Sequence, residues 1–259
     1  MDVDAYLARI GAKRPAEPSA EALRDLHERH TTTVPFENLS VHLPERIELT
    51  EDALVDKIAR RRRGGFCYEL NGAFAALLRA LGFEVSLLAA RVQGGERLGA
   101  PFDHLTLQVD LDEPWLADVG FGRFARFPLR MNACESQFDP EGEFLLLDAP
   151  GGDVDVVHDG TLAYRLERRP RELADFVPYC WWQATSPDSH FTQGLLCTLP
   201  TAAGRITLAG DRLVESVDGK RVERVLVGEE IVAAYHTHFG IELSEAPAAG
   251  TFPAPGPAK

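Results

Sequence analysis

The sequence predicts an α+β protein in which a helical bundle precedes a mainly antiparallel β region. Up to about residue 83, apolar side chains recur at the three- to four-residue spacing of amphipathic helices. After Gly82 the spacing changes to that of strands, and dipeptides such as Asp159-Gly160 are typical of hairpin turns. We therefore expect helices within residues 1–83 and, from residue 84, a small β-barrel or a strongly curved sheet.

The helices of the first part are predicted from apolar stripes and from the residues that cap them. A helix over residues 3–10 ends at Gly11, and Ser19 can cap a second helix, which we expect to give way where the threonine run begins at Thr31, since that run disfavours helix. Thr50, followed by two acidic residues, begins a third helix that runs into Arg60–Arg63. After Gly64-Gly65, the most apolar helix begins at Cys67. The segment Val34–Leu39 between these helices is expected to be an ordered connection.

The β region is predicted from short alternating or apolar runs bounded by turn residues. Strands are expected over residues 84–92, 104–111, 115–119, 144–147, 154–157 and 162–166. Helical residues return at about 171–180, strands at 191–198 and 205–208, and a closing helix at 231–239. Asp218-Gly219 is another hairpin signal. The tail from Ala246 to Lys259 is rich in Ala, Pro and Gly, and is expected to be disordered.

Charge and cysteine content exclude several classes of function. The 259 residues carry a formal net charge of -13 at pH 7, which argues against broad binding of nucleic acids or anionic membranes, because both require a basic surface. The acidic N-terminus, Met1–Tyr6, lacks the layout of a signal peptide. The four cysteines are widely spaced, with no C-x-x-C pair. We therefore expect a cytoplasmic protein with no metal site and no disulfide framework.

Cys67 is the first candidate for chemistry because it lies at the start of a helix. Unpaired N–H groups at a helix N-terminus favour the thiolate, so this position is expected to lower the pKa of the thiol. The alternative is a small residue that only packs under a Gly-Gly turn, which is the commoner role of a free cysteine.

His104 and Asp118 supply the partners that a nucleophilic thiol requires. His104 opens one predicted strand and Asp118 ends the next, across a tight turn, so the two side chains are expected to be neighbours. An imidazole near the thiol can take its proton, and a carboxylate can orient the imidazole. The three residues together are better explained as a Cys-His-Asp triad than as unrelated structural residues.

Other candidate groups carry less weight. His27 and His30 are interpreted as part of a charged helix face, whereas His190, beside a possible pocket residue, is the best rival to His104. Arg60–Arg63 could meet a phosphate, but a solvated helix end is the preferred interpretation. The turn Gly120–Gly122 is not followed by the Gly-Lys-Ser/Thr of a phosphate-binding loop.

These residues resemble the motifs of the arylamine N-acetyltransferase family. The resemblance rests on the blocks Val34–Leu39, Arg63–Asn71, His104 at a strand start, Asp118–Gly122 and Ser186–Phe191, in the same order and spacing. It covers about residues 1–200. It implies a helical bundle at 1–83, a central antiparallel β-barrel at 84–185 and a C-terminal α/β lid at 186–259, around a core like that of cysteine proteases.

The resemblance also implies an activity and the residues that serve it. Cys67 matches the acetyl-accepting nucleophile, His104 the base and Asp118 the orienting acid, while Phe36, Phe121 and Phe191 match aromatic residues that line the substrate pocket. The implied reaction is ping-pong acetyl transfer from acetyl-CoA to an arylamine, arylhydrazine or hydrazide, as in xenobiotic metabolism. No residue that contacts coenzyme A is assigned. An amide synthase, a thiol amidohydrolase and a non-catalytic binding module remain as alternatives.

Overall fold

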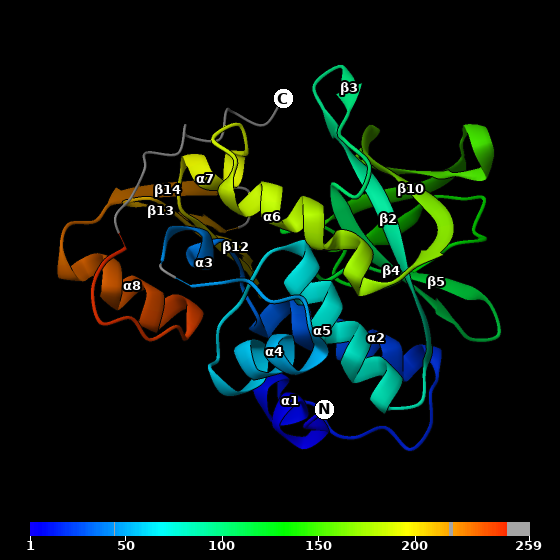
Figure 1. The fold of residues 1–259 in the computed structure, drawn as a ribbon, viewed down its shortest axis with the longest axis horizontal. Helices are drawn as coiled ribbons and strands as arrows, with labels where there is room; N and C mark the ends of the chain where they lie inside the picture. Colours follow the sequence, from blue (N-terminus) through cyan, green and yellow to red (C-terminus); the bar gives the residue numbers. More distant parts are fainter. Residues whose placement is uncertain (44, 218–219, 248–259) are drawn as a thin grey trace.

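The computed structural model describes residues 1–43, 45–217 and 220–247 (Figure 1). It confirms the α+β class: helices of the first third lie beside a strongly curved antiparallel sheet, and a second sheet lies on their other side. Within the described ranges, every helix falls short of the length and apolar character that a bilayer span requires.

The helical bundle is formed by short capped helices packed around one long buried helix. Asp2, Ser19 and Thr50 each accept a hydrogen bond from a backbone N–H of the first turn that follows them. Gly11 ends the first helix in the left-handed conformation, with a φ of 66°. The elements are α1 (Val3–Ile10), α2 (Ala20–Thr33), α3 (Leu39–His42), α4 (Glu51–Val55), the π-helical turn η1 (Asp56–Arg60) and α5 (Cys67–Ala80).

Helix α2 extends further than its sequence predicts. It continues through the threonine run to Thr33 because the hydroxyls of Thr31 and Thr32 bond back to the carbonyls of His27 and Glu28. These bonds occupy side chains that would otherwise compete with the helical backbone. Val34, which precedes a proline, then ends the helix in an extended conformation.

The large sheet is antiparallel throughout and curls into a nearly closed barrel. Its strand order is β6-β5-β4-β2-β10-β9-β8-β7, with β3 paired to β2. The two edge strands approach each other where the side chain of Gln137 accepts from the Arg130 N–H at 2.7 Å and donates to the Arg130 carbonyl at 3.0 Å. The strands are β2 (Glu84–Gly94), β3 (Arg97–Leu98), β4 (His104–Asp110), β5 (Pro114–Ala117), β6 (Leu129–Arg130), β7 (Gln137–Asp139), β8 (Gly142–Asp148), β9 (Val154–His158) and β10 (Thr161–Arg171).

The predicted hairpin at Asp159-Gly160 is confirmed. It joins β9 to β10, and both residues have positive φ, as a type I′ turn requires. The turn predicted at Asp218-Gly219 lies outside the described residues, although the flanking residues Val217 and Lys220 pair antiparallel. The part of the predicted disordered tail over residues 248–259 also lies outside them.

The smaller sheet forms the lid, and it includes one strand from the N-terminal part of the chain. Its order is β1-β11-β12-β13-β14, where β1 (Phe36–Glu37) pairs with β11. The segment 34–39, expected to be a connection, is therefore partly a strand. The remaining elements are β11 (Leu196–Thr201), β12 (Gly204–Ala209), β13 (Arg212–Val217), β14 (Lys220–Val225) and α8 (Glu229–Phe239).

Three helical segments lead from the barrel to the lid. They are η3 (Leu173–Phe176), α6 (Val177–Thr185) and α7 (His190–Gln193), and α6 crosses above α5 (Figure 1). The strand predicted at 191–198 is wrong in its first half, because the Ser189 hydroxyl accepts the Phe191 N–H and starts α7 instead. The boundaries of the three-part division at residues 83 and 185 remain a prediction.

Candidate active site

Cys67 is the first residue of α5 and is buried, with 4% of its surface exposed. The two glycines before it are required by close approach. A Cβ at Gly64 would lie 2.0 Å from the Pro35 carbonyl oxygen, and one at Gly65 would lie 2.7 Å from the Glu69 side chain. The turn therefore brings the helix start against the segment that leads into β1.

A buried ionic network holds the start of α5 and the Gly-Gly turn before it in place. The carboxylate of Glu69 accepts the Phe66 N–H at 3.3 Å and pairs with Lys57 at 2.6 Å. Arg63 is 5% exposed and pairs with Glu37 at 2.9 Å and with Glu45 at 3.2 Å. The interpretation of Arg60–Arg63 as a solvated helix end is therefore wrong for Arg63, whose charge is held between carboxylates under the Gly-Gly turn.

His104 and Asp118 are joined by a hydrogen bond of 2.6 Å between Nε2 and Oδ2. The ladder of β4 and β5 ends at the pair Leu107–Ala117. Continuing this register by one residue places Asp118 opposite Thr106, two residues from His104 and on the same face of the sheet. The neighbourhood expected from the two strand ends is thus realised as a diagonal cross-strand contact.

The Asp118 carboxylate is held by four donors, three of which the sequence reasoning missed. Oδ1 accepts from the Asn71 side chain at 2.9 Å and from the Gly120 N–H at 3.0 Å. Oδ2 accepts from His104 and from the Tyr164 hydroxyl at 3.0 Å. Asn71 lies one helical turn after Cys67, so α5 positions both the thiol and this carboxylate. The spacing of four residues between Cys67 and Asn71 was the available signal for that link.

The imidazole of His104 lies against the thiol of Cys67, and each group shifts the pKa of the other. Burial by itself would lower the pKa of His104, but the charge and hydrogen bond of Asp118 raise it to about 10. His104 is therefore protonated at neutral pH, with its charge between the carboxylate and the sulfur.

The expected lowering of the Cys67 pKa at the helix start is contradicted. Burial raises the pKa of the thiol and outweighs the hydrogen bond and charge of His104, which act in the opposite direction. His104, rather than the helix N-terminus alone, is therefore the group that favours the thiolate against the effect of burial. The two groups titrate as a coupled pair.

The thiol and imidazole open into a cleft of about 520 Å³. Phe36, Phe121 and Phe191 all line it, although they come from β1, the loop after β5 and α7. The Phe121 ring lies 5.2 Å from the His104 ring, and the Phe36 and Phe191 rings are 6.1 Å apart. The three predicted pocket aromatics therefore share one cavity with Cys67, and its size and apolar walls suit a small flat ligand.

The same cleft also has polar residues in its lining. Asp103, Gln183 and His190 line it, and the Gln183 amide donates to Asp103 at 3.0 Å. His190, the best rival to His104, therefore reaches the cleft, but burial lowers its pKa and the group that interacts with Cys67 is His104.

His27 and His30 do not lie on a solvated face, in contrast to their interpretation from sequence. Both are buried, at 1% and 0% exposure. His27 contacts the backbone of the loop that carries Asp118: its Nε2 accepts the Asp118 N–H at 3.1 Å. The spacing of Leu23, Leu26, His27 and His30 places all four on one helix stripe, and this was the signal that could have found them.

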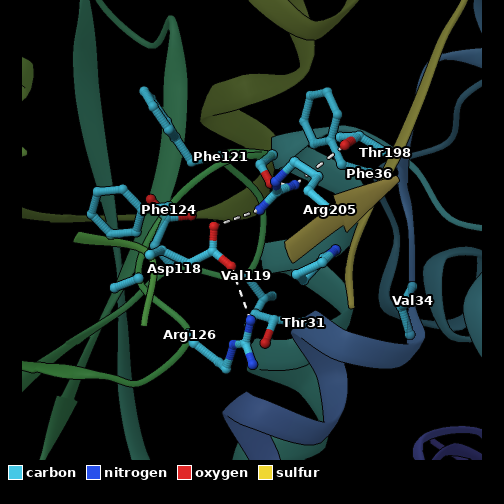
Figure 2. A pocket seen from close by; sticks show the side chains of 14 residues that line it. Thr31, Val34, Phe36, Asp118, Val119, Phe121, Phe124, Arg126, Thr198 and Arg205 are labelled. Carbon is cyan, nitrogen blue, oxygen red and sulfur yellow. Dashed lines mark hydrogen bonds and ion pairs between the residues drawn. The ribbon is translucent and has the colours of Figure 1, made fainter. Parts of the chain in front are cut away.

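Residues of the loop that carries Asp118 also line a small cavity of about 20 Å³ (Figure 2). Arg205 of the lid donates to the Gly122 carbonyl at 2.9 Å and to Glu141 at 3.1 Å, and Arg126 donates to the other oxygen of Glu141 at 3.1 Å. The cavity has room for about one water molecule. It therefore marks a contact between lid, barrel and loop rather than a substrate site.

Comparisons with known proteins agree with this architecture. A family model described as N-acetyltransferase matches residues 19–248. The arylamine N-acetyltransferase / N-hydroxyarylamine O-acetyltransferase of Salmonella typhimurium is 38% identical over 252 residues, which cover 93% of this chain and 89% of that protein.

Several solved structures match over most of their length, among them two arylamine N-acetyltransferases. The arylamine N-acetyltransferase of Salmonella typhimurium has a TM-score of 0.85 and 34% identity, covering 92% of this chain and 90% of that one. The Mycobacterium marinum arylamine N-acetyltransferase in complex with CoA has a TM-score of 0.84 and 32% identity, covering 93% of each chain. From the matched family model and these relatives, the chain belongs to the arylamine N-acetyltransferase family, whose members are acyltransferases.

Proposed function

We propose that the chain transfers the acetyl group of acetyl-CoA to the nitrogen of arylamines, arylhydrazines or hydrazides through an acetyl-cysteine at Cys67. The observation that carries the proposal is the line of contacts from the Cys67 thiol through His104 to the Asp118 carboxylate, at the wall of an aromatic cleft. Acyl transfer requires a nucleophile, a group that moves a proton and an orienting carboxylate, and these three residues are of the right types.

In the first half-reaction, the Cys67 thiolate attacks the thioester carbonyl of acetyl-CoA. The bond between the carbonyl carbon and the CoA sulfur breaks, and His104 gives its Nδ1 proton to the leaving sulfur, since its Nε2 is bonded to Asp118. The products are free coenzyme A and acetyl-Cys67. Asp118 keeps its charge and holds the ring of His104 in place.

In the second half-reaction, the amine nitrogen attacks the acetyl-Cys67 carbonyl. Neutral His104 takes the proton from that nitrogen, the carbon–sulfur bond breaks, and the thiolate–imidazolium pair returns. An aromatic amine is weakly basic and therefore neutral near pH 7, so its lone pair is free to attack. The two half-reactions share one site, which predicts ping-pong kinetics.

The cleft supports the choice of acceptor. Phe36, Phe121 and Phe191 offer ring faces and edges within reach of Cys67, and a flat arylamine gains both apolar burial and stacking there. The Mycobacterium marinum relative whose solved structure contains CoA supports acetyl-CoA as the donor. We propose a cytoplasmic role in the metabolism of xenobiotic amines.

The test separates the acetyl-enzyme from the overall reaction. The protein is mixed with acetyl-CoA in the absence of amine, and the Cys67 peptide is examined by mass spectrometry. The expected result is one acetyl group on Cys67 with release of one equivalent of coenzyme A, both lost in Cys67→Ser. Acetylation elsewhere, or amide hydrolysis without use of acetyl-CoA, would contradict the proposal.

A further inference from the structure

His27 lies on α2, a helix that contributes nothing to the proposed triad, yet it contacts the backbone on both sides of the pocket loop, residues 118–126. Its Nε2 lies 3.1 Å from the Asp118 nitrogen, and its Nδ1 lies 2.9 Å from the Arg126 oxygen. Between these two anchors the loop carries Phe121, which lines the cleft. One imidazole therefore spans the loop at its base.

The two partners allow only one state of the ring. The Asp118 backbone N–H can only donate, so Nε2 must be an unprotonated acceptor. The Arg126 carbonyl can only accept, so Nδ1 must carry the proton. His27 is thus fixed as the neutral Nδ1–H tautomer. A protonated ring would present an N–H to the Asp118 N–H and lose that bond.

The surroundings of the ring favour this neutral form. His27 is 1% exposed, and burial lowers its pKa despite the charges of Asp118 and of Asp139 on β7. From its own helix it faces His30, and from α5 it meets the edge of the Phe74 ring at 6.0 Å. The side chain of Arg126 is directed to Glu141 instead.

We propose that His27 is a positioning residue for acetyl transfer, whose neutral ring closes the pocket loop and so sets both the Asp118 carboxylate and the Phe121 wall. This inference rests on the proposed function. The Asp118 carboxylate is held by three side chains and the Gly120 N–H, and the Asp118 backbone N–H is held by His27. Loss of the backbone contact lets the carboxylate move relative to His104, and proton transfer is sensitive to displacements of that size.

His30 provides a matched control on the same helix. It is also buried, and it packs against the same Phe74 ring at 5.2 Å. Among the described residues, neither of its ring nitrogens has a hydrogen-bond partner. His30→Phe therefore removes a buried imidazole without removing a bond to the loop, whereas His27→Phe removes two.

The experiment compares His27→Phe, His27→Gln and His30→Phe with the wild-type chain, using acetyl-CoA and p-anisidine. We expect His27→Phe to lower kcat by about tenfold or more, with KM for acetyl-CoA within about twofold. His30→Phe should stay within about twofold of the wild-type kcat. His27→Gln should stay within about threefold, because the amide oxygen and nitrogen can replace the acceptor and the donor.

A second measurement does not depend on acetyl transfer. The rate of alkylation of Cys67 by iodoacetamide is followed across pH for each variant. Displacement of Asp118 lowers the pKa of His104 and so weakens the stabilisation of the Cys67 thiolate by the imidazolium. The alkylation profile of His27→Phe should therefore shift to higher pH, while those of His27→Gln and His30→Phe should not. If the wild-type chain fails to acetylate p-anisidine, the proposed function falls, but this comparison still tests His27.

Equal kcat and equal alkylation profiles for His27→Phe and His30→Phe would overturn the proposal. If His27→Phe does not fold, the decision passes to His27→Gln. A folded Gln variant within threefold of wild type, with an unshifted profile, supports the positioning role. A folded Gln variant that loses more than about tenfold in kcat overturns it, since its amide keeps both bonding capacities.

Discussion

Cys67 and Cys180 are both buried, and they differ in what faces the sulfur. Cys67 begins α5 with 4% exposure, and Cys180 lies on α6 with 3%. Burial raises the pKa of both thiols. At Cys67 the neighbouring His104 opposes this rise in pKa, whereas at Cys180 the nearby charge of Glu69 adds to it. The group next to the sulfur, rather than burial or position in a helix, is therefore what distinguishes the proposed nucleophile from Cys180.

The largest expected effect comes from replacing the sulfur of each cysteine by a hydroxyl. Cys67→Ser should lower acetyl transfer by about 10⁴-fold or more, because a hydroxyl is a far weaker nucleophile at this pH. Cys180→Ser should keep transfer within a few fold and instead lower the midpoint of thermal unfolding, since it buries a hydroxyl at a cost of about 1–3 kcal/mol. Steady-state assays and thermal melts of the two variants distinguish these outcomes. Comparable losses of transfer in both would contradict the distinction.

The next effect removes the charge behind His104. Asp118→Asn should lower kcat by roughly 10³- to 10⁴-fold, as expected when the residue that orients a catalytic imidazole is neutralised. In the wild type, the raised pKa of His104 keeps its proton until the pH rises through about 10. Transfer should therefore decline on that alkaline side, and the decline should move to lower pH in the variant. A pH profile that is identical in both proteins would remove Asp118 from the proposed triad.

The reactivity of the buried cysteines can also be compared without any substrate, by alkylation. Iodoacetamide at about neutral pH should alkylate Cys67 on the order of 10²-fold faster than Cys180 or Cys197, because thiolate reacts and thiol does not. Cys197 is 0% exposed, and burial also raises its pKa. Peptide mapping over time gives all three rates. Similar rates at Cys67 and Cys180 would show that His104 does not activate the sulfur.

The smallest expected effect lies in the cleft rather than at the thiol. Phe191→Leu removes a ring that contacts Phe66 at a centroid distance of 5.2 Å and faces the cavity. We expect about a tenfold rise in KM for an arylamine, with little change in the rate of acetylation of Cys67 by acetyl-CoA. Stopped-flow measurement of coenzyme A release separates the acetylation of Cys67 from the transfer to the amine. A matching fall in the acetylation rate would place Phe191 in the first half-reaction.

Sequence patterns were sufficient for the parts of this molecule that depend on local spacing. The start of α5, the strands that begin at His104 and end before Asp118, and the turn at Asp159-Gly160 all follow from periodicity, capping and turn chemistry. The three pocket phenylalanines came from the family resemblance, because they lie on elements that only tertiary folding brings together.

The supporting contacts could not be found in the same way. Tyr164 reaches Asp118 from β10, and Arg63 is buried although it follows a run of exposed cations. The spacing of His27 places it on the apolar stripe of α2, but its polarity suggested a solvated face. Polar residues that complete an apolar stripe are better interpreted as buried: His27 is buried with two hydrogen bonds, and His30 is buried although neither ring nitrogen has a partner among the described residues.

The pairing of strand β1 with β11 makes completion of the cleft a late step in the synthesis of this chain. Phe36 stands next to Glu37, and both pair with β11, while Asn38 donates to the carbonyl of Phe191, 153 residues later in the chain. Most of the chain must therefore emerge from the ribosome before Phe36 can pair with β11. Contacts of such long sequence separation form slowly. Until they form, the nascent chain holds Cys67 beside an unfinished cleft.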